Sequence, residues 1–145
     1  MNNDLHTNIK LLPNKNTYDN ICKILDANNI THNDFTNDTH STIIYSPDLI
    51  DIKTIKMPDI KMPIIGTNAR LEYFDTMDDG IVMVIEFDSD TASELFQYLK
   101  TKYLFTTKYN DFRPHITIQK NIDKKIPLPN IDFDLVFDEL KMEIK

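Results

Sequence analysis

The feature that most constrains the fold is a strand–helix–loop–strand pattern that occurs twice along the chain. In the first copy, residues 5–12 alternate polar and apolar side chains, which is typical of a strand with one buried face. Apolar residues over 18–25 then recur at the i, i+3, i+4, i+7 spacing of an amphipathic helix. After a polar loop, residues 40–45 form a short β-rich run.

The second copy repeats this order. Residues 81–87 (IVMVIEF) form an apolar run of strand length, introduced by Asp79-Gly80. A helix follows, with its apolar face at Ala92, Leu95, Phe96, Leu99 and Tyr103. Residues 114–118 predict the closing strand. The chain therefore predicts two β-α-β units, each closed by a strand that carries a histidine.

The rest of the chain supplies further strands. Residues 64–65 and 69–74 are expected to be two of them, and residues 47–63 to be irregular or extended. Over residues 131–144, the parity of the apolar positions changes between Phe137 and Leu140, which indicates a bulge or a bend into two strands. No linker divides the chain, so residues 1–145 are expected to form a single domain.

Capping residues set the expected limits of the helices. Asn16 or Thr17 can cap the first helix, and Asn28-Asn29 can end it. Ser89 or Asp90 can cap the second helix.

Composition excludes several classes of function. The net charge of −7 disfavours binding to long nucleic acids, which normally requires a basic face. Small anionic substrates stay compatible with this charge, because a few placed cations can hold them. Two glycines in the whole chain exclude a P-loop or a dinucleotide fingerprint. No run approaches the roughly 20 apolar residues of a membrane span, and a cytoplasmic protein is expected.

Two histidines and the one cysteine are expected to have no catalytic role. Cys22 lies at an apolar helical position and is interpreted as a buried structural thiol. His6 and His32 lie in polar surroundings and are expected to be solvated. No zinc spacing is present, so neither a metal nor another cofactor is expected.

The other two histidines each begin a His-x-Thr motif. His40 and Thr42 belong to HSTIIY, and His115 and Thr117 belong to HITI. On a strand, residues i and i+2 point to the same face, so each histidine emerges beside its threonine. Ile43 and Tyr45, and likewise Ile116 and Ile118, are then expected to pack on the helices. A pseudo-two-fold relation between the two units would direct both pairs into one cleft.

Two imidazoles and two hydroxyls in one cleft suit in-line attack on a phosphodiester. One histidine would accept a proton from the nucleophile, a water or a ribose 2′-hydroxyl, and the other would protonate the leaving oxygen. The threonine hydroxyls would donate to the non-bridging phosphate oxygens. No metal is required. The sequence does not assign which histidine is the acid and which is the base.

These residues resemble the two-histidine (2H) phosphoesterase superfamily, whose mark is paired His-x-Thr/Ser motifs in a duplicated fold. The resemblance implies an α+β, LigT-like fold, with two β-α-β lobes and antiparallel sheets around a central cleft. Within the superfamily, the short acidic chain is most similar to the phage anti-CBASS nucleases. These degrade the cyclic oligonucleotide signals with which bacteria trigger abortive defence.

The resemblance also implies roles for particular residues. His40 and His115 would be the acid–base pair, and Thr42 and Thr117 the phosphate anchors. Relatives of this kind are expected to hold bases by aromatic stacking and to recognise an adenine edge with an acidic residue. Glu139 and Glu143, on the non-core parity of the last strand, are the candidates for that residue, with ordinary solvated glutamates as the alternative. The stacking candidates, which the sequence does not rank, are Tyr45, Tyr73 and Tyr109, with core parity counting against Tyr45.

Arg113 lies two residues before His115 and shares its face. It could bring positive charge to the phosphate. It could equally be a surface arginine paired with Asp111 or another acid.

The leading hypothesis is therefore a phosphodiesterase that cuts 3′-5′ bonds in cyclic di- or trinucleotides, in the host bacterial cytoplasm if the chain is of phage origin. A same-fold alternative is an RNA-processing enzyme for 2′,3′-cyclic phosphates or 2′-5′ bonds. From another class comes a sponge that binds a nucleotide without cutting it. A metallohydrolase with His40 and His115 as ligands is the remaining reading. The sequence does not give the oligomeric state.

Overall fold

The computed structural model describes residues 5–108 and 111–145. The elements in chain order are β1 (Thr7–Pro13), α1 (Lys15–Ala27), β2 (Ser41–Ser46), the short 3-10 helix η1 (Ile52–Thr54), β3 (Ile64–Asp75), β4 (Ile81–Asp88), α2 (Asp90–Tyr103), β5 (His115–Gln119) and β6 (Leu135–Ile144). Within the described residues, no helix has the length and apolar character needed to cross a membrane.

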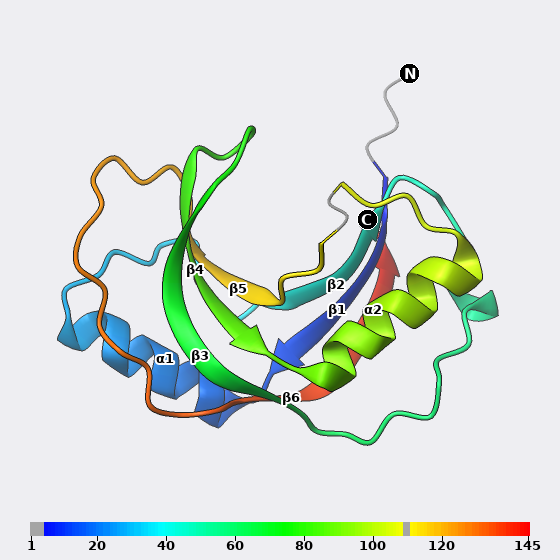
Figure 1. The fold of residues 1–145 in the computed structure, drawn as a ribbon, viewed down its shortest axis with the longest axis horizontal. Helices are drawn as coiled ribbons and strands as arrows, with labels where there is room; N and C mark the ends of the chain where they lie inside the picture. Colours follow the sequence, from blue (N-terminus) through cyan, green and yellow to red (C-terminus); the bar gives the residue numbers. More distant parts are fainter. Residues whose placement is uncertain (1–4, 109–110) are drawn as a thin grey trace.

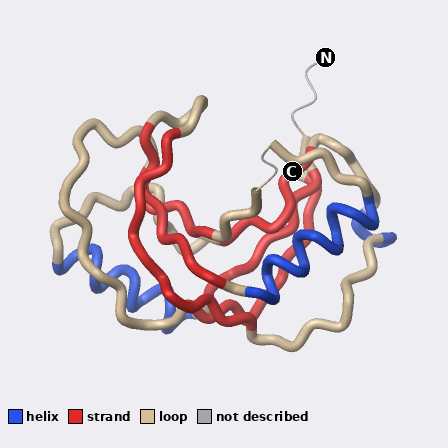
Figure 2. Tube along the Cα trace, viewed as in Figure 1, coloured by secondary structure: helices blue, strands red, loops and turns tan. Residues whose placement is uncertain are grey.

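The strands form one antiparallel sheet in the order β2-β1-β6-β3-β4-β5. The two sheets expected from the sequence are therefore the halves of one continuous sheet. It is strongly curved, with both helices outside the curve and the concave side open (Figure 1; Figure 2). The edge strands are β2 and β5, and some of their Cα atoms lie within 8 Å of each other. Curvature thus brings together the two strands that carry the His-x-Thr motifs.

Strand β3 joins the two halves of the sheet. Its first residues, Ile64–Gly66, pair with β6, and Thr67–Asp75 pairs with β4. The change of partner coincides with a register shift and with Asn68 at a φ of 51°. Two strands were predicted here; the chain instead bends between two pairings without leaving the sheet.

One face of the sheet packs into the core, and the opposite face lines the concave side. Ile9 and Leu11 of β1, and Ile85 and Phe87 of β4, are fully or almost fully buried in the core. Both helices add apolar side chains to the same core, among them Ile21, Leu25, Leu95 and Leu99. Cys22 is half-buried at its edge, and burial raises the pKa of its thiol.

The first helix begins earlier than predicted. Asn14 is its N-cap, and its side-chain oxygen accepts a hydrogen bond from Thr17 N at 2.9 Å. Thr17 is buried, and its hydroxyl instead accepts a hydrogen bond from Val136 N at 3.0 Å. The prediction of Asn16 or Thr17 as the cap is therefore wrong. The predicted limits at Asn28 and Ser89 are confirmed.

Both motif strands contain a one-residue bulge directly after the threonine. The register of β2 shifts at Ile43, because Lys10 opposes Thr42 while Ile9 opposes Ile44. The register of β5 shifts at Ile118, because Val84 opposes Thr117 while Met83 opposes Gln119. A bulge reverses the parity of the residues beyond it. The two copies therefore share a local distortion as well as a motif.

The bulge in β2 overturns one prediction. Tyr45 was expected to pack on a helix, but its side chain is 52% exposed and lines the concave side. Ile44 takes the buried position instead. In β6, the predicted change of parity is confirmed as a bulge at Asp138, where Leu12 opposes Glu139 and Pro13 opposes Phe137.

Candidate active site

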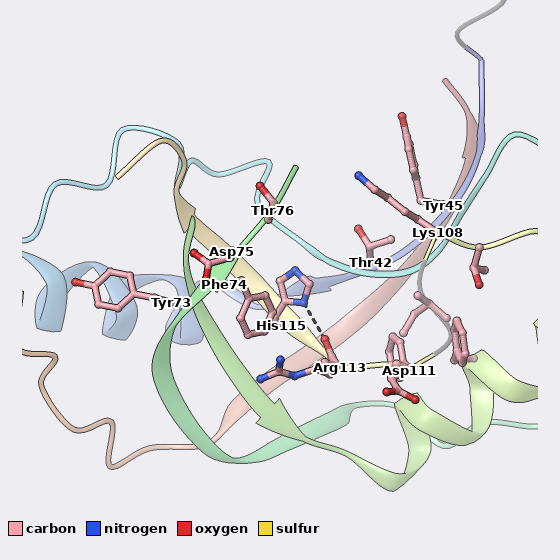
Figure 3. Close-up of a pocket in the computed structure, with 14 residues that line it drawn as sticks. Thr42, Tyr45, Tyr73, Phe74, Asp75, Thr76, Lys108, Asp111, Arg113 and His115 are labelled. Carbon is pink, nitrogen blue, oxygen red and sulfur yellow. Dashed lines mark hydrogen bonds between the residues drawn. The ribbon is translucent and has the colours of Figure 1, made fainter. Parts of the chain in front are cut away.

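A cavity of about 730 Å³ occupies the concave side of the sheet. Its walls come from β2, the end of β3 and the residue after it, one residue of α2, the segment that connects α2 to β5, and the first residue of β5. Thr42 of the first motif and His115 of the second line the same cavity. In Figure 3, His115 lies beside Phe74, and Thr42 lies on the β2 side of the cavity. Each copy of the repeat thus contributes a motif residue to one site.

The two motif histidines are held by the same type of contact. His115 Nδ1 lies 2.8 Å from the carbonyl oxygen of Arg113, and His40 Nδ1 lies 3.1 Å from that of Asp38. A carbonyl only accepts hydrogen bonds, so Nδ1 is the protonated nitrogen in each ring. In the neutral form, Nε2 is then left as the acceptor. Both rings are oriented as a general base requires, and protonation converts either into an acid.

His40 directly precedes β2 and is not among the residues that line the cavity. Its environment is nevertheless that of the concave face, because the charges of Lys10 and Glu143 act on it. Lys10 opposes Thr42 in the sheet, and Glu143 belongs to the same face of β6. Burial and the Lys10 ammonium lower the pKa of His40, against a raising effect of the Asp38 carbonyl.

The ring of Phe74 and the ion pair between Arg113 and Glu86 lie beside His115. Its ring meets that of Phe74 edge-on, with centroids 5.1 Å apart. Glu86 opposes it across β4 and β5. Burial is the largest influence and lowers the pKa of His115, while the Arg113 carbonyl and the Glu86 carboxylate raise it.

Arg113 lines the cavity beside His115, as its position in the sequence predicted. Its acidic partner is Glu86 rather than Asp111: Nε and Nη2 donate to the two carboxylate oxygens at 2.6 Å and 3.0 Å. Its guanidinium also lies 4.3 Å from the centroid of Phe74. Glu86 is buried, and Arg113 holds the pKa of its carboxyl below the ordinary value. These contacts fix the guanidinium at the cavity wall.

The remaining predicted site residues lie on the same face but outside the cavity lining. Thr117 is half-buried opposite Val84. Glu139 is exposed, and Glu143 forms ion pairs with Lys10 at 2.6 Å and with Lys141 at 3.6 Å. The Lys10 contact lowers the pKa of Glu143. Whether either glutamate contacts a base stays a prediction.

Lys10 is the residue of this face that sequence reasoning missed. It occupies a polar position of an alternating strand, which normally indicates contact with solvent. Its side chain is instead only 9% exposed. The two-fold repeat was the signal that could have indicated the burial of Lys10, because it turns the polar face of β1 toward the opposing half of the sheet.

The aromatic residues predicted to stack on a base differ in where they lie. Tyr45 lines the cavity, and its ring stacks on His6 at 4.2 Å between centroids. Tyr73 also lines it, but its hydroxyl bonds to the backbone of Ile126. Tyr109 lies outside the described residues. Phe74 was not among the candidates and contacts both His115 and Arg113.

His32 is less solvated than expected. Its Nε2 lies 2.7 Å from Asp26 Oδ1, and 23% of its side chain is exposed. Among residues 5–108 and 111–145, no group of three or more His, Cys, Asp or Glu side chains could hold a metal ion.

Comparison with known proteins places the chain in a family. The sequence profile described as "Anti-CBASS protein Acb1" matches residues 5–144. The chain belongs to the Acb1 anti-CBASS family. The resemblance to 2H phosphoesterases, inferred from the paired motifs, and to anti-CBASS nucleases, inferred from the length and composition of the chain, is confirmed.

A solved structure shares the fold of this Acb1 family member. The crystal structure of E. coli LigT complexed with 3′-AMP matches it with a TM-score of 0.62, at 12% sequence identity. The match covers 98% of this chain and 88% of that one. The expected α+β, LigT-like fold is confirmed. No curated protein sequence matches the chain.

Proposed function

We propose that this protein is a metal-independent phosphodiesterase that hydrolyses 3′-5′ bonds of cyclic di- or trinucleotides and so blocks CBASS signalling in the host bacterial cytoplasm. Membership of the Acb1 family and the LigT-like fold support a phosphodiesterase that acts on nucleotides. The observation that carries the finer proposal is the shared cavity, which is lined by Thr42 of one motif and by His115 of the other.

The chemistry follows from the two rings. The neutral histidine accepts the proton of the attacking water or 2′-hydroxyl at Nε2, while the protonated histidine gives one to the leaving oxygen. His40 and His115 are the pair, and Thr42 and Thr117 donate hydrogen bonds to the non-bridging oxygens as charge grows on them. Arg113 adds a fixed positive charge beside His115, where the phosphate would lie.

The size of the site and the net charge of the chain support a small substrate. A cavity of about 730 Å³ is in the range of pockets that enclose small ligands. The net charge of −7 works against the approach of a long polyanion. Both features favour a cyclic oligonucleotide over a tRNA-sized molecule.

A substrate panel tests this proposal. The purified protein is incubated with a cyclic dinucleotide, a cyclic trinucleotide and an RNA with a 2′,3′-cyclic phosphate end, and products are separated by chromatography. We expect turnover of the cyclic oligonucleotides. Turnover of the RNA end alone would assign an RNA-processing role, and stoichiometric recovery of bound, intact cyclic nucleotide would assign a sponge.

A further inference from the structure

The two strands that carry the motifs are the opposite edges of one sheet. Some Cα atoms of β2 and β5 lie within 8 Å of each other, yet backbone pairing connects these strands by the long route through β1, β6, β3 and β4. Two histidines that act on one phosphate need fixed positions, because a displacement of about 1 Å can cost about 100-fold in rate. A direct connection between the two edges would therefore matter for the reaction.

Two hydrogen bonds form such a connection, from the segment before β2 to the end of β5. The carboxylate of Asp34 accepts a hydrogen bond from Lys120 N at 2.8 Å, and Asp34 N donates to Gln119 Oε1 at 3.3 Å. Figure 1 shows this segment, between α1 and β2, passing the end of β5. Asp34 thus uses its side chain and its backbone to join parts of the chain that are 85 and 86 positions apart.

A hydrogen-bonded turn carries this connection to His40. Phe35 anchors the start of the turn, because its ring is buried in the core. Thr36 N donates to Thr39 Oγ1 at 2.8 Å, and Thr39 N donates to the carbonyl of Thr36 at 2.9 Å. Asp38, inside this turn, provides the carbonyl that lies 3.1 Å from His40 Nδ1. A displacement at the start of the segment is therefore transmitted to the imidazole.

The other end of the connection is joined to His115 by a paired strand. His115 begins β5 and Gln119 ends it, and both residues pair with β4. A strand rises about 3.3 Å per residue, so about 13 Å of paired backbone separates the connection from the histidine. The two motif histidines are thus linked through Asp34 by segments that are each held by hydrogen bonds.

These contacts lie at the surface. Asp34 is exposed and Gln119 is half-buried. Hydrogen bonds that water can replace add little to the stability of a fold. The consequence of the connection is therefore expected in the geometry of the site rather than in the stability of the chain.

We propose that Asp34 is a positioning residue of the active site, whose hydrogen bonds to Lys120 and Gln119 fix the separation between His40 and His115. This inference rests on the proposed function and deepens it, because a reaction with two histidines needs both rings at one phosphate. Asp34 lies outside the cavity lining and acts through the backbone on either side of it.

Steady-state hydrolysis of a cyclic dinucleotide tests the proposal. Asp34→Ala is expected to lower kcat about fivefold and to leave KM within twofold, because the rings shift while the cavity that holds the substrate is kept. Asp34→Asn retains an acceptor oxygen for Lys120 N and should stay within twofold of the wild type. Asp34→Ala/Gln119→Met removes both hydrogen bonds and should lower kcat about twentyfold.

Asp51 provides the matched control. It is also exposed, and its carboxylate accepts a hydrogen bond from Lys53 N at 3.0 Å, but this contact is local to η1. Asp51→Ala removes the same charge and the same type of hydrogen bond, and it should leave kcat unchanged. All rates are measured well below the Tm of each variant. Equal losses of kcat in Asp51→Ala and Asp34→Ala, or no rescue by Asp34→Asn, would overturn the proposal.

Histidine NMR spectra separate this inference from the proposed function. The ring signal of His40 should shift in Asp34→Ala and return to its wild-type position in Asp34→Asn, and this readout does not depend on turnover. Such shifts in a protein that cleaves no cyclic nucleotide would leave the positioning of His40 standing and reject the phosphodiesterase. Cleavage by the wild type, with kcat and the His40 signal unchanged in Asp34→Ala, would reject the inference alone.

Discussion

His40 directly precedes the edge strand β2 and His115 begins the edge strand β5, and each has its Nδ1 within hydrogen-bond distance of the main-chain carbonyl two residues earlier, at 3.1 Å and 2.8 Å. The duplicated sequence thus gives a duplicated ring orientation. Each Nε2 is available for proton transfer, and the two rings differ chiefly in the charges around them: Lys10 and Glu143 near His40, Glu86 and Arg113 near His115.

The pH dependence of the reaction should reflect burial of both rings. Burial lowers the pKa of His40 and of His115 below the ordinary value of about 6.5. The base therefore stays neutral in weak acid, while the acid loses its proton before pH 7. We expect kcat/KM to be highest below about pH 6.5 and to fall as the pH rises through neutrality. A profile that keeps rising to pH 8 would contradict this reading.

Replacing Lys10 should change the titration of His40. The Lys10 ammonium lowers the pKa of His40, so Lys10→Met is expected to raise it. One limb of the kcat/KM profile should then move to higher pH: the acidic limb if His40 is the base, the alkaline limb if it is the acid. Lys141→Met is the control, because Lys141 is 51% exposed and lies 3.6 Å from the same Glu143. An unchanged profile in Lys10→Met would refute the electrostatic role.

Glu86 should support both stability and the position of Arg113. Glu86→Gln removes the charge from a side chain that is 8% exposed and accepts two hydrogen bonds from Arg113, with an expected loss of about 2 kcal/mol at pH 7. Urea denaturation measures this loss. KM should rise as well, because the guanidinium is no longer fixed.

The loss of stability in Glu86→Gln should depend on pH in a defined direction. Arg113 lowers the pKa of Glu86 in the folded state, so the carboxylate stabilises the fold above its ordinary pKa, and this contribution disappears as the pH falls through the lowered pKa. The difference between wild type and Glu86→Gln should therefore narrow in acid. A difference that is constant from pH 7 to pH 3 would show that the effect is steric. Asp88→Asn is the control. The Asp88 side chain pairs with Arg70 but is 58% exposed, so this substitution should change stability little.

A side chain at Gly66, where β3 changes its pairing partner, should destabilise the fold. An added Cβ would lie 2.5 Å from Cδ2 of Phe87, a buried ring packed against Phe137. Gly66→Ala is expected to cost about 2 kcal/mol, which lowers Tm by about 6 °C. Adding Phe87→Leu should recover part of the loss in a double-mutant cycle. Strictly additive effects would argue against a clash with this ring.

The sequence predicted the elements of this fold because their signals are local. Helical spacing over residues 18–25 and the apolar run over residues 81–87 depend on neighbours within a few turns, and both elements form as expected. The paired motifs predicted that His40, Thr42, His115 and Thr117 would all face one cleft. Thr42 and His115 line the cavity, and His40 and Thr117 do not.

The misses came from features that local patterns do not contain. The bulge at Ile43 reversed the parity of Tyr45 and brought that ring to the cavity. Lys10 looked solvent-facing because an alternating strand does not show what lies opposite its polar face. The ion pair between Lys108 and Asp78 joins residues 30 positions apart, a separation that no local sequence pattern spans.

The most direct test of the two-histidine mechanism is hydrolysis of a cyclic dinucleotide in excess EDTA by wild type, by His40→Ala/His115→Ala and by His32→Ala. His32 is the matched control, since it pairs with Asp26 and lies outside the cavity lining. We expect cleavage by wild type and His32→Ala and none by the folded double variant. Loss of wild-type activity in EDTA, or cleavage by the double variant, would contradict the mechanism.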